Sequence, residues 1–342
     1  MNISKTNILK DSIKSVLSDW NRNYKHHGGL SSITKCILGT LFYFSKTKKH
    51  PRKKIEILTF SVIPGLTYFW FKCMSSLKNF KNISITIGDC SGGLKIKNKD
   101  INLNLYPIIN LEHGYKLDLF FSKICNADYI VVSDDDIFFQ TSEPLEWAIN
   151  QFNENNNLGV VSLYPRKNKA SWLENLDFVM GSYCLVIRTE IWLKERLSFQ
   201  QVKPANWRKI GDFFDTADFA NHLLIEKGYD VVCLPQTLQN KLVSFTSLSL
   251  WGLRIQQTRG YINKAIRARP NEYEKAYRTA ITLSELNNLF LDNQIKYNTV
   301  KQKFLERTIK ITKSKIDKYL LNEISLDVKN QINNIRKINF IL

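Results

Sequence analysis

Three consecutive carboxylates, Asp134, Asp135 and Asp136, come directly after the apolar and β-branched run 129–132. Carboxylates at the end of a buried strand cost free energy unless a cation compensates them. Mg²⁺ and Mn²⁺ prefer oxygen ligands, which they often share between protein carboxylates and substrate phosphates. In extended backbone, Asp134 and Asp136 can face one ion while Asp135 points elsewhere. The triplet therefore predicts a divalent-metal site that also binds phosphate. The alternative is a solvated acidic loop.

The elements that must position this triplet can be read from the surrounding pattern. From about residue 54 to residue 240, short apolar strands alternate with helical segments. This alternation is typical of an α/β fold with a mostly parallel sheet flanked by helices. In such sheets ligands bind outside the carboxyl ends of the strands, where the triplet falls. We expect strands at 55–60, 83–87, 129–132, 158–163, 183–187 and 230–234, and helices at 66–77, 117–125 and 218–226.

Both ends of the chain lie outside this pattern and are basic. The chain has 49 Lys and Arg against 31 Asp and Glu, a net charge of +18. Residues 1–56 alone hold twelve Lys and Arg against three Asp and Glu. Such an excess predicts a polyanionic partner, either nucleic acid, an anionic membrane or a phosphorylated substrate. We therefore expect a basic, amphipathic helical extension at 1–53, an α/β domain at 54–240 and a basic helical region at 241–342.

The N-terminal extension combines apolar and basic residues in an order that suits a peripheral anchor. Apolar residues between 33 and 44 precede the basic cluster at 46–54, as expected for attachment to an anionic membrane. The alternative is that these helices pack on the α/β domain with their lysines solvated. The apolar stretch is too short to span a bilayer, and no signal peptide is visible. Six scattered cysteines without a C-x-x-C pair favour a reducing compartment. We expect a cytoplasmic protein, peripheral at the inner face of the plasma membrane.

Four segments, in chain order, resemble those of the GT-A glycosyltransferases, and in particular the family-2-like bacterial enzymes. They are 57–61 as the first strand, 85–91 as the second strand with its acidic turn, 112–116 as a glycine-containing segment, and 133–137 as the D-x-D motif. The resemblance covers about residues 55–240. It implies a Rossmann-like GT-A fold and transfer of a sugar from a nucleoside-diphosphate-sugar, a UDP-sugar being favoured. The acceptor would be a hydroxyl of a glycan or lipid-linked molecule, in bacterial surface polysaccharide synthesis.

The resemblance also implies roles for single residues. Mn²⁺ or Mg²⁺ would be held by Asp134 and Asp136. Asp89 would contact the nucleobase, and Lys116 the base or phosphate. Members of the family more often have an Asn in the segment that corresponds to residues 112–116 of this chain. The candidate donor-binding residues are Thr59, Ser61, Asp89, His113, Lys116, Asp134, Asp135 and Gly181.

A fifth segment, 211–232, resembles the region where these enzymes carry the acceptor-side carboxylate. Members usually have Glu-Asp there, whereas this chain offers Asp215 and Asp218. An inverting transfer needs a general base that takes the proton of the attacking hydroxyl. We favour Asp218, because it lies at the start of the predicted helix, with Asp215 as the second candidate. Either residue could instead act only as a cap or first-turn acid of that helix. Inversion and retention both stay open.

Two other functions fit parts of the sequence. A metal-dependent nucleotidyltransferase also places carboxylates at strand ends, but residues 62–65 form no Gly-rich or basic phosphate loop. A non-enzymatic nucleic-acid or membrane-binding protein would explain the charge of +18. It would leave the carboxylates after a buried strand without a role. We therefore expect no nucleic-acid partner.

Overall fold

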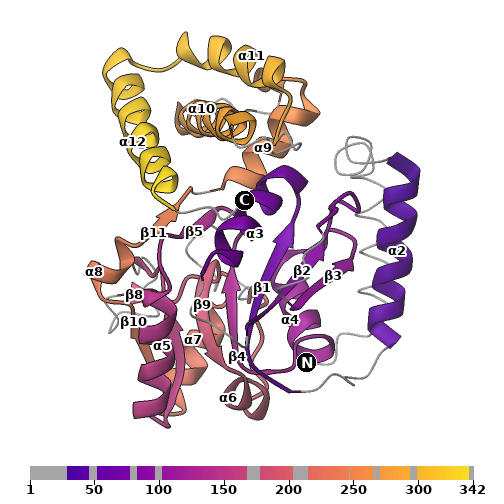
Figure 1. The fold of residues 1–342 in the computed structure, drawn as a ribbon, viewed down its shortest axis with the longest axis vertical. Coiled ribbons are helices and arrows are strands. Elements are labelled where there is room, and N and C mark those ends of the chain that lie inside the picture. Colours follow the sequence, from indigo (N-terminus) through magenta and orange to yellow (C-terminus); the bar gives the residue numbers. More distant parts are fainter. Residues whose placement is uncertain are drawn as a thin grey trace.

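The computed structural model describes residues 29–45, 52–77, 83–96, 102–167, 178–202, 215–245, 247–264, 266, 270–292 and 299–338. They form a central sheet with helices on both faces and a further group of helices beyond one end of the sheet (Figure 1). This arrangement confirms the predicted α/β fold, a mostly parallel sheet flanked by helices with a helical C-terminal region. The helix predicted within the first 28 residues, the basic residues 46–51 and most of the segment 203–214 lie outside the described residues.

The main sheet has seven strands in the order β10-β6-β9-β4-β1-β2-β3. Every neighbouring pair is parallel except those of β9, which runs antiparallel to both β4 and β6. The strands are β1 (Lys53–Ser61), β2 (Ile83–Asp89), β3 (Asn102–Pro107), β4 (Ala127–Ser133), β6 (Leu158–Ser162), β9 (Cys184–Arg188) and β10 (Asp230–Cys233). The strand that ends at the acidic triplet is therefore near the middle of the sheet.

The central strands β1 and β4 are buried on both faces, which is why they read as nearly continuous apolar runs. Their side chains alternate between two cores. Ile57 and Val131 belong to one core, and Leu58 and Val132 belong to the other. The first core is completed by α3 (Pro64–Ser75), α5 (Glu143–Glu154) and the C-terminal helices. The second is completed by α4 (His113–Lys123), α6 (Thr189–Lys194) and α7 (Asp218–Glu226).

Most predicted elements are confirmed, and the differences have local causes. The helix predicted at 117–125 begins earlier, at His113, because Glu112 accepts a hydrogen bond from the backbone N–H of Tyr115 and caps it. The strand β3 and the helices α5 and α6 were not predicted. The helix α7 has the predicted bounds, and Gly228 follows it with φ of +78°, a conformation that glycine adopts without strain.

The C-terminal region is continuous with the sheet domain. A short strand, β11 (Leu242–Ser244), pairs antiparallel with β5 (Ile137–Phe139), which follows the triplet. The helices after it pack into the core that α3 also faces. They are α9 (Leu248–Gln257), α10 (Pro270–Asp292), α11 (Gln302–Lys313) and α12 (Lys318–Arg336), with α8 (Gln236–Gln239) before β11 and the 3₁₀ turn η2 (Ile262–Lys264) after α9. The predicted boundary at residue 240 thus falls just before a strand that pairs with the sheet domain.

The helix α2 (Gly29–Ser45) packs beside the edge strand β3. Its inner side contributes Ile33 and Cys36 to a small core, and the hydroxyl of Thr40 accepts a hydrogen bond from the backbone N–H of Ile109, at 2.9 Å. Gly39 allows the close approach, because a Cβ at this position would lie 2.1 Å from the carbonyl oxygen of Pro107. Within the described part of the chain, no helix has the length and apolar character needed to cross a membrane.

Replacing Gly39 by alanine is expected to destabilise the protein by about 1–3 kcal/mol, because the added methyl group must push α2 away from β3. The measurement is the free energy of unfolding in urea. Ser31→Ala, on the exposed side of the same helix, is the control and is expected to change stability by about 0.5 kcal/mol or less. Equal stability of the Gly39→Ala variant and the wild type would contradict the close packing.

Candidate active site at the carboxyl end of the sheet

A cleft of about 490 Å³ opens at the carboxyl end of β1 and β4. All three members of the acidic triplet line it, together with His113 and Lys116 from α4. The opposite wall comes from the C-terminal region through Ser244, Ser247, Ser249, Leu250 and Leu253. The cleft therefore lies at the strand ends, where the sequence predicted that a ligand binds.

Asp134 is the member of the triplet whose carboxylate receives no hydrogen bond from the described residues. Burial and the charge of the neighbouring Asp135 together raise its pKa from 3.8 to about 7, against the opposing effect of Lys116. Its backbone N–H is fixed by a hydrogen bond to the carbonyl of Tyr183, the residue before β9, at 2.8 Å. A carboxylate held in place, poorly solvated and without a donor is suited to bind a cation.

Asp135 and Asp136 are tied to the elements around the cleft. Asp135 accepts hydrogen bonds from Thr67 on α3, at 2.6 Å, and from Ser249 on α9, at 2.8 Å. One oxygen of Asp136 accepts the backbone N–H of Leu248, the first residue of α9, at 2.9 Å. Burial raises the pKa of Asp135 to about 6 and that of Asp136 well above its ordinary value. Asp136 therefore caps α9 and retains one oxygen for another partner.

The chemistry of these carboxylates fits a divalent cation that the substrate helps to hold. Among the described residues, no group of three or more His, Cys, Asp or Glu side chains is arranged to hold a metal ion by itself. Asp134 and the second oxygen of Asp136 nevertheless offer hard oxygen donors on one side of the cleft. Mg²⁺ is commonly bound by one or two carboxylates plus substrate phosphates rather than by a complete protein cage.

A buried lysine supplies the positive charge of the cleft. The ammonium of Lys116 lies 2.9 Å from the side-chain oxygen of Asn110 and 4.9 Å from the ring centre of Phe60. Its charge lowers the pKa values of Asp134 and Asp135. It also contributes, after burial, to lowering the pKa of His113 to about 4. His113 is therefore neutral at physiological pH, and its hydrogen bond with the backbone of Ser182 engages the one N–H of the neutral ring.

Three of the predicted donor-binding residues lie beneath the cleft rather than on its surface. Both oxygens of Asp89 are engaged by its own loop, because they accept hydrogen bonds from Ser91, Gly92 and Leu94. Thr59 and Ser61 are buried on β1. None of the three lines the cleft. Contact of Asp89 with a nucleobase stays a prediction, and its observed contacts are those of a residue that shapes the loop.

Gly181 has a packing reason of its own. A Cβ at this position would lie 2.5 Å from the ring of Tyr183 and 2.8 Å from the carbonyl oxygen of Tyr164. The two tyrosines meet edge to face, with ring centres 6.1 Å apart, and both line the cleft. Gly181 therefore lets an aromatic wall form close to the triplet, whether or not it contacts a ligand.

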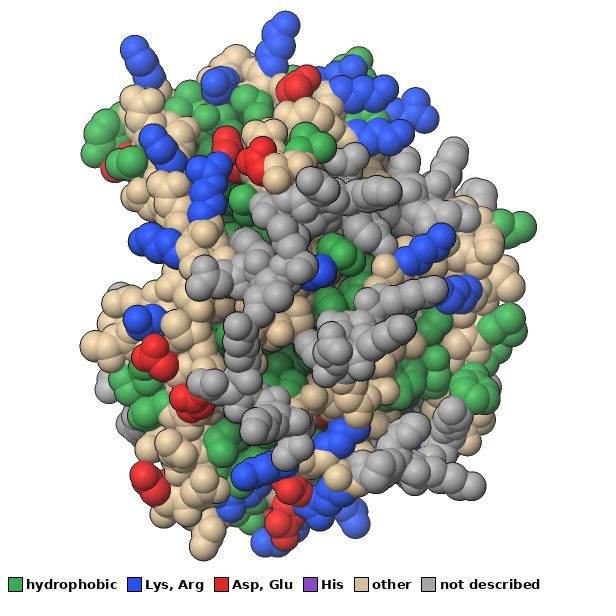
Figure 2. All heavy atoms as spheres, viewed as in Figure 1, with side chains coloured by type: hydrophobic (Ala, Val, Ile, Leu, Met, Phe, Trp, Pro, Cys, Tyr) green, Lys and Arg blue, Asp and Glu red, His purple; other side chains and the backbone are tan. Residues whose placement is uncertain are grey.

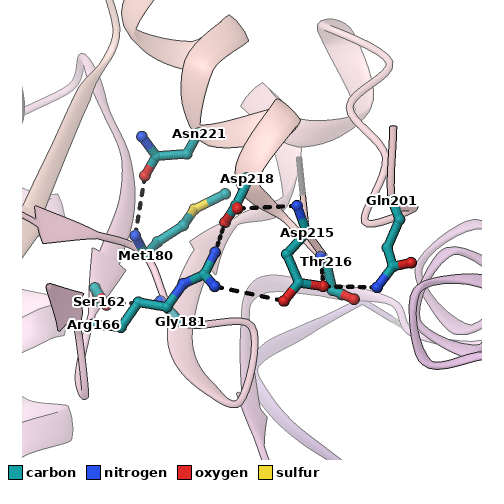
Figure 3. A network of polar contacts seen from close by, with 9 residues as sticks. All are labelled: Ser162, Arg166, Met180, Gly181, Gln201, Asp215, Thr216, Asp218 and Asn221. Carbon is teal, nitrogen blue, oxygen red and sulfur yellow. Dashed lines mark hydrogen bonds and ion pairs between the residues drawn. The ribbon is translucent and has the colours of Figure 1, made fainter. Parts of the chain in front are cut away.

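The two candidate bases, Asp215 and Asp218, lie in one network with Arg166 of β7 (Arg166–Lys167), which pairs with β8 (Phe178–Val179) (Figure 3). The Arg166 guanidinium forms an ion pair with the buried Asp218 and lies 3.6 Å from a carboxylate oxygen of Asp215. The second oxygen of Asp218 accepts the backbone N–H of Asp215, at 3.0 Å. The charge of Asp218 is therefore balanced by Arg166, and each of its carboxylate oxygens already has a partner.

Asp215 is the more available carboxylate of the two. Its side chain is 48% exposed, compared with 6% for Asp218. It is oriented by Gln201, which donates a hydrogen bond at 2.7 Å, and by the backbone N–H of Thr216. Its charge raises the pKa of His113, against the larger effect of burial, although Asp215 does not itself line the cleft. Ala217, the N-cap residue of α7, has a strained backbone conformation with φ of +70°, which fixes the turn of the chain between Asp215 and the helix.

Several residues that hold the candidate site residues in place were not predicted from the sequence, and of these only Ser249 lines the cleft. Thr67, Ser249 and the backbone of Leu248 hold the triplet, and Arg166 holds the candidate bases. Ser249 follows Asp135 by 114 positions, so no local pattern could have linked them.

No protein-family model and no curated protein matches this chain. Solved structures with a partly similar fold include a mannosyltransferase from Pyrobaculum calidifontis, in complex with GDP-mannose and Mn²⁺. It has 10% sequence identity and a TM-score of 0.41, over 94% of this chain and 98% of that one. Glucosyl-3-phosphoglycerate synthase from Mycobacterium tuberculosis, with Mn²⁺ and UDP, has 11% identity and a TM-score of 0.36, over 55% and 77%.

A third similar structure is not a glycosyltransferase. The 4-diphosphocytidyl-2C-methyl-D-erythritol synthase from Anaerococcus prevotii has 11% identity and a TM-score of 0.33, over 53% of this chain and 88% of that one. Identities near a tenth and TM-scores of this size describe a partial likeness in fold. They carry no information on the substrate of this chain.

The replacement Asp134→Asn is expected to stabilise the metal-free protein at high pH. Because the pKa of Asp134 rises from 3.8 unfolded to about 7 folded, the folded state binds a proton that the unfolded state releases between these values. Stability therefore falls as pH rises from about 4 to 7, by up to about 4 kcal/mol. In EDTA near pH 8, the free energy of unfolding of the variant is expected to be about 2–4 kcal/mol higher than that of wild type. The difference should vanish near pH 4.

The matched control is Asp89→Asn, which should behave in the opposite way. It places an amide among donors that a carboxylate satisfied, so we expect a loss of about 1–3 kcal/mol at neutral pH. Chemical denaturation across this pH range measures both variants. A destabilised Asp134→Asn protein at about pH 8 would mean that Asp134 supports the fold as Asp89 does.

Proposed function

We propose that this protein is a metal-dependent glycosyltransferase that moves a sugar from a nucleoside-diphosphate-sugar, a UDP-sugar being favoured, to a hydroxyl of a glycan or lipid-linked acceptor. One observation carries the proposal. The buried carboxylates of Asp135 and Asp136 and the partly exposed carboxylate of Asp134, all with raised pKa values, meet a buried lysine in a cleft at the carboxyl end of a central parallel strand. Such a site is electrostatically incomplete until a cation and its anionic partner enter it.

The donor would bind across the cleft with its diphosphate between the triplet and α4. Asp134 and Asp136 would hold Mn²⁺ or Mg²⁺, which acts as a Lewis acid on the departing diphosphate when bound. Lys116 would add positive charge near the leaving group, and His113 would line the site as a neutral side chain whose unprotonated ring nitrogen can accept a hydrogen bond. Asp135 would act as a positioning residue, because its bonds to Thr67 and Ser249 connect the triplet to α3 and α9.

For an inverting reaction, Asp215 is the better candidate for the base that takes the acceptor proton. Its carboxylate is 48% exposed and oriented by Gln201, although it also lies 3.6 Å from the Arg166 guanidinium, whereas Asp218 is buried against the same guanidinium. Asp218 would instead position Asp215 by accepting its backbone N–H. This assignment reverses the preference drawn from the sequence, where both residues were candidates. Bacterial surface polysaccharide synthesis in the cytoplasm is the setting in which we place the reaction.

Incubation with a panel of UDP- and GDP-sugars and Mn²⁺ tests the proposal, with nucleoside diphosphate release as the measurement. We expect release from at least one donor, none in EDTA, and a loss of roughly 100-fold or more in kcat/KM for Asp134→Ala and Asp136→Ala. Asp327→Ala, at an exposed ion pair on α12, is the control. Pyrophosphate release from nucleoside triphosphates, without turnover of any sugar donor, would indicate a nucleotidyltransferase instead.

The roles of Asp215 and Asp218 can be separated by pH profiles of transfer with an active acceptor. Asp215→Asn is expected to lower kcat by roughly 10²–10⁴-fold and to remove the acid limb of the profile. Asp218→Asn leaves Arg166 without its buried partner, so we expect a lower unfolding free energy with the acid limb retained. A profile that loses its acid limb only in Asp218→Asn would assign the base to Asp218.

A further inference from the structure

The outer face of α2 is apolar and exposed, although the opposite side of the same helix is packed on the domain. The exposed fractions are 71% for Leu30, 60% for Leu38, 43% for Leu41 and 53% for Phe42. At 100° per residue these four side chains fall within about one third of the helix circumference. Figure 2 shows several hydrophobic side chains, separated by other side chains, along the edge where Figure 1 draws α2. Large exposed apolar side chains gathered on one helix face mark a candidate interaction site.

The charges in the sequence of this helix and of the segment that follows it are of one sign. Residues 29–55 contain seven Lys and Arg and no Asp or Glu. Lys35, on the helix, and Lys54, at the start of β1, are exposed, and Arg52 is 64% exposed beside Asp128. An aliphatic face with basic neighbours fits the boundary between the acyl chains and the headgroups of anionic lipid. It does not fit nucleic acid, for which aromatic side chains would be interleaved with the basic ones.

The inner side of α2 connects this face to the cleft. Thr40 binds the backbone N–H of Ile109, and the next two residues, Asn110 and Leu111, line the cleft. Asn110 also accepts the hydrogen bond of Lys116. Attachment through α2 would therefore place the rim of the cleft near the membrane surface.

We propose that α2 lies flat on an anionic membrane, with Leu30, Leu38, Leu41 and Phe42 inserted among the lipids, and so holds the cleft beside membrane-embedded acceptors. The binding part of this inference stands on the exposed face and its charges. Only the presentation of a lipid-linked acceptor rests on the proposed function. Because the inner side of α2 is packed on the domain, the helix lies along the surface instead of inserting across it.

Co-sedimentation of the full-length protein with phosphatidylcholine vesicles, with and without about one third phosphatidylglycerol, tests the proposal. We expect binding that requires the anionic lipid and weakens with added salt. The double variant Leu38→Glu/Phe42→Glu should bind roughly tenfold more weakly or worse. Leu326→Glu, at an equally exposed leucine on α12 (62%), is the matched control and should bind as wild type does.

Circular dichroism establishes that the variants are folded, and release of nucleoside diphosphate from a soluble donor should be unchanged in all of them. Three results would overturn the proposal: no binding to either vesicle, equal loss in the control, or binding without dependence on anionic lipid. Self-association that the double variant abolishes, in place of vesicle binding, would assign the face to a second copy of the chain. Vesicle binding without turnover of any donor would instead contradict the proposed function alone.

Discussion

Three adjacent carboxylates that end a buried central strand are a constraint around which the neighbouring elements are arranged. Water solvates them poorly, so their charges must be met by donors, by a buried cation or by protonation. All three responses are present in the cleft. Thr67, Ser249 and the first backbone N–H of α9 supply donors, Lys116 supplies a charge, and the pKa values rise. Asp134 is left with the least compensation, which makes it the natural ligand for an incoming cation.

This constraint also explains why the C-terminal helices are part of the site. The amino end of α9 carries a partial positive charge, and Asp136 is bonded to it. The same helix provides Ser249 for Asp135, and the strand β11 before it pairs with β5 directly after the triplet. The chain segment beyond residue 240 therefore closes one wall of the cleft. Binding or release of a cation at the triplet would therefore act on α9 through the hydrogen bonds of Asp135 and Asp136.

The sequence predicted those features that depend on local pattern. Apolar β-branched runs marked the buried strands, and the triplet after the run 129–132 marked the position of the cleft. The edge strand β3 was missed because its side chains are only partly buried and alternate weakly. Pairings across the fold were also out of reach, since nothing near Asp136 in the sequence points to Leu248. For Asp215 and Asp218 the sequence offered two carboxylates. Both lie beside Arg166 in the structure, and only their exposed fractions, 48% and 6%, separate them.

The central claim is that the triplet binds a divalent cation together with a nucleoside diphosphate. Titration of Mn²⁺ followed by electron paramagnetic resonance, with and without UDP or GDP, tests it without requiring the acceptor. The account predicts that the protein removes the free Mn²⁺ signal, that one of the two nucleotides tightens this binding, and that Asp134→Asn and Asp136→Asn abolish it. Mn²⁺ binding that is equal in the wild type and both variants, or absent with either nucleotide, would contradict the account.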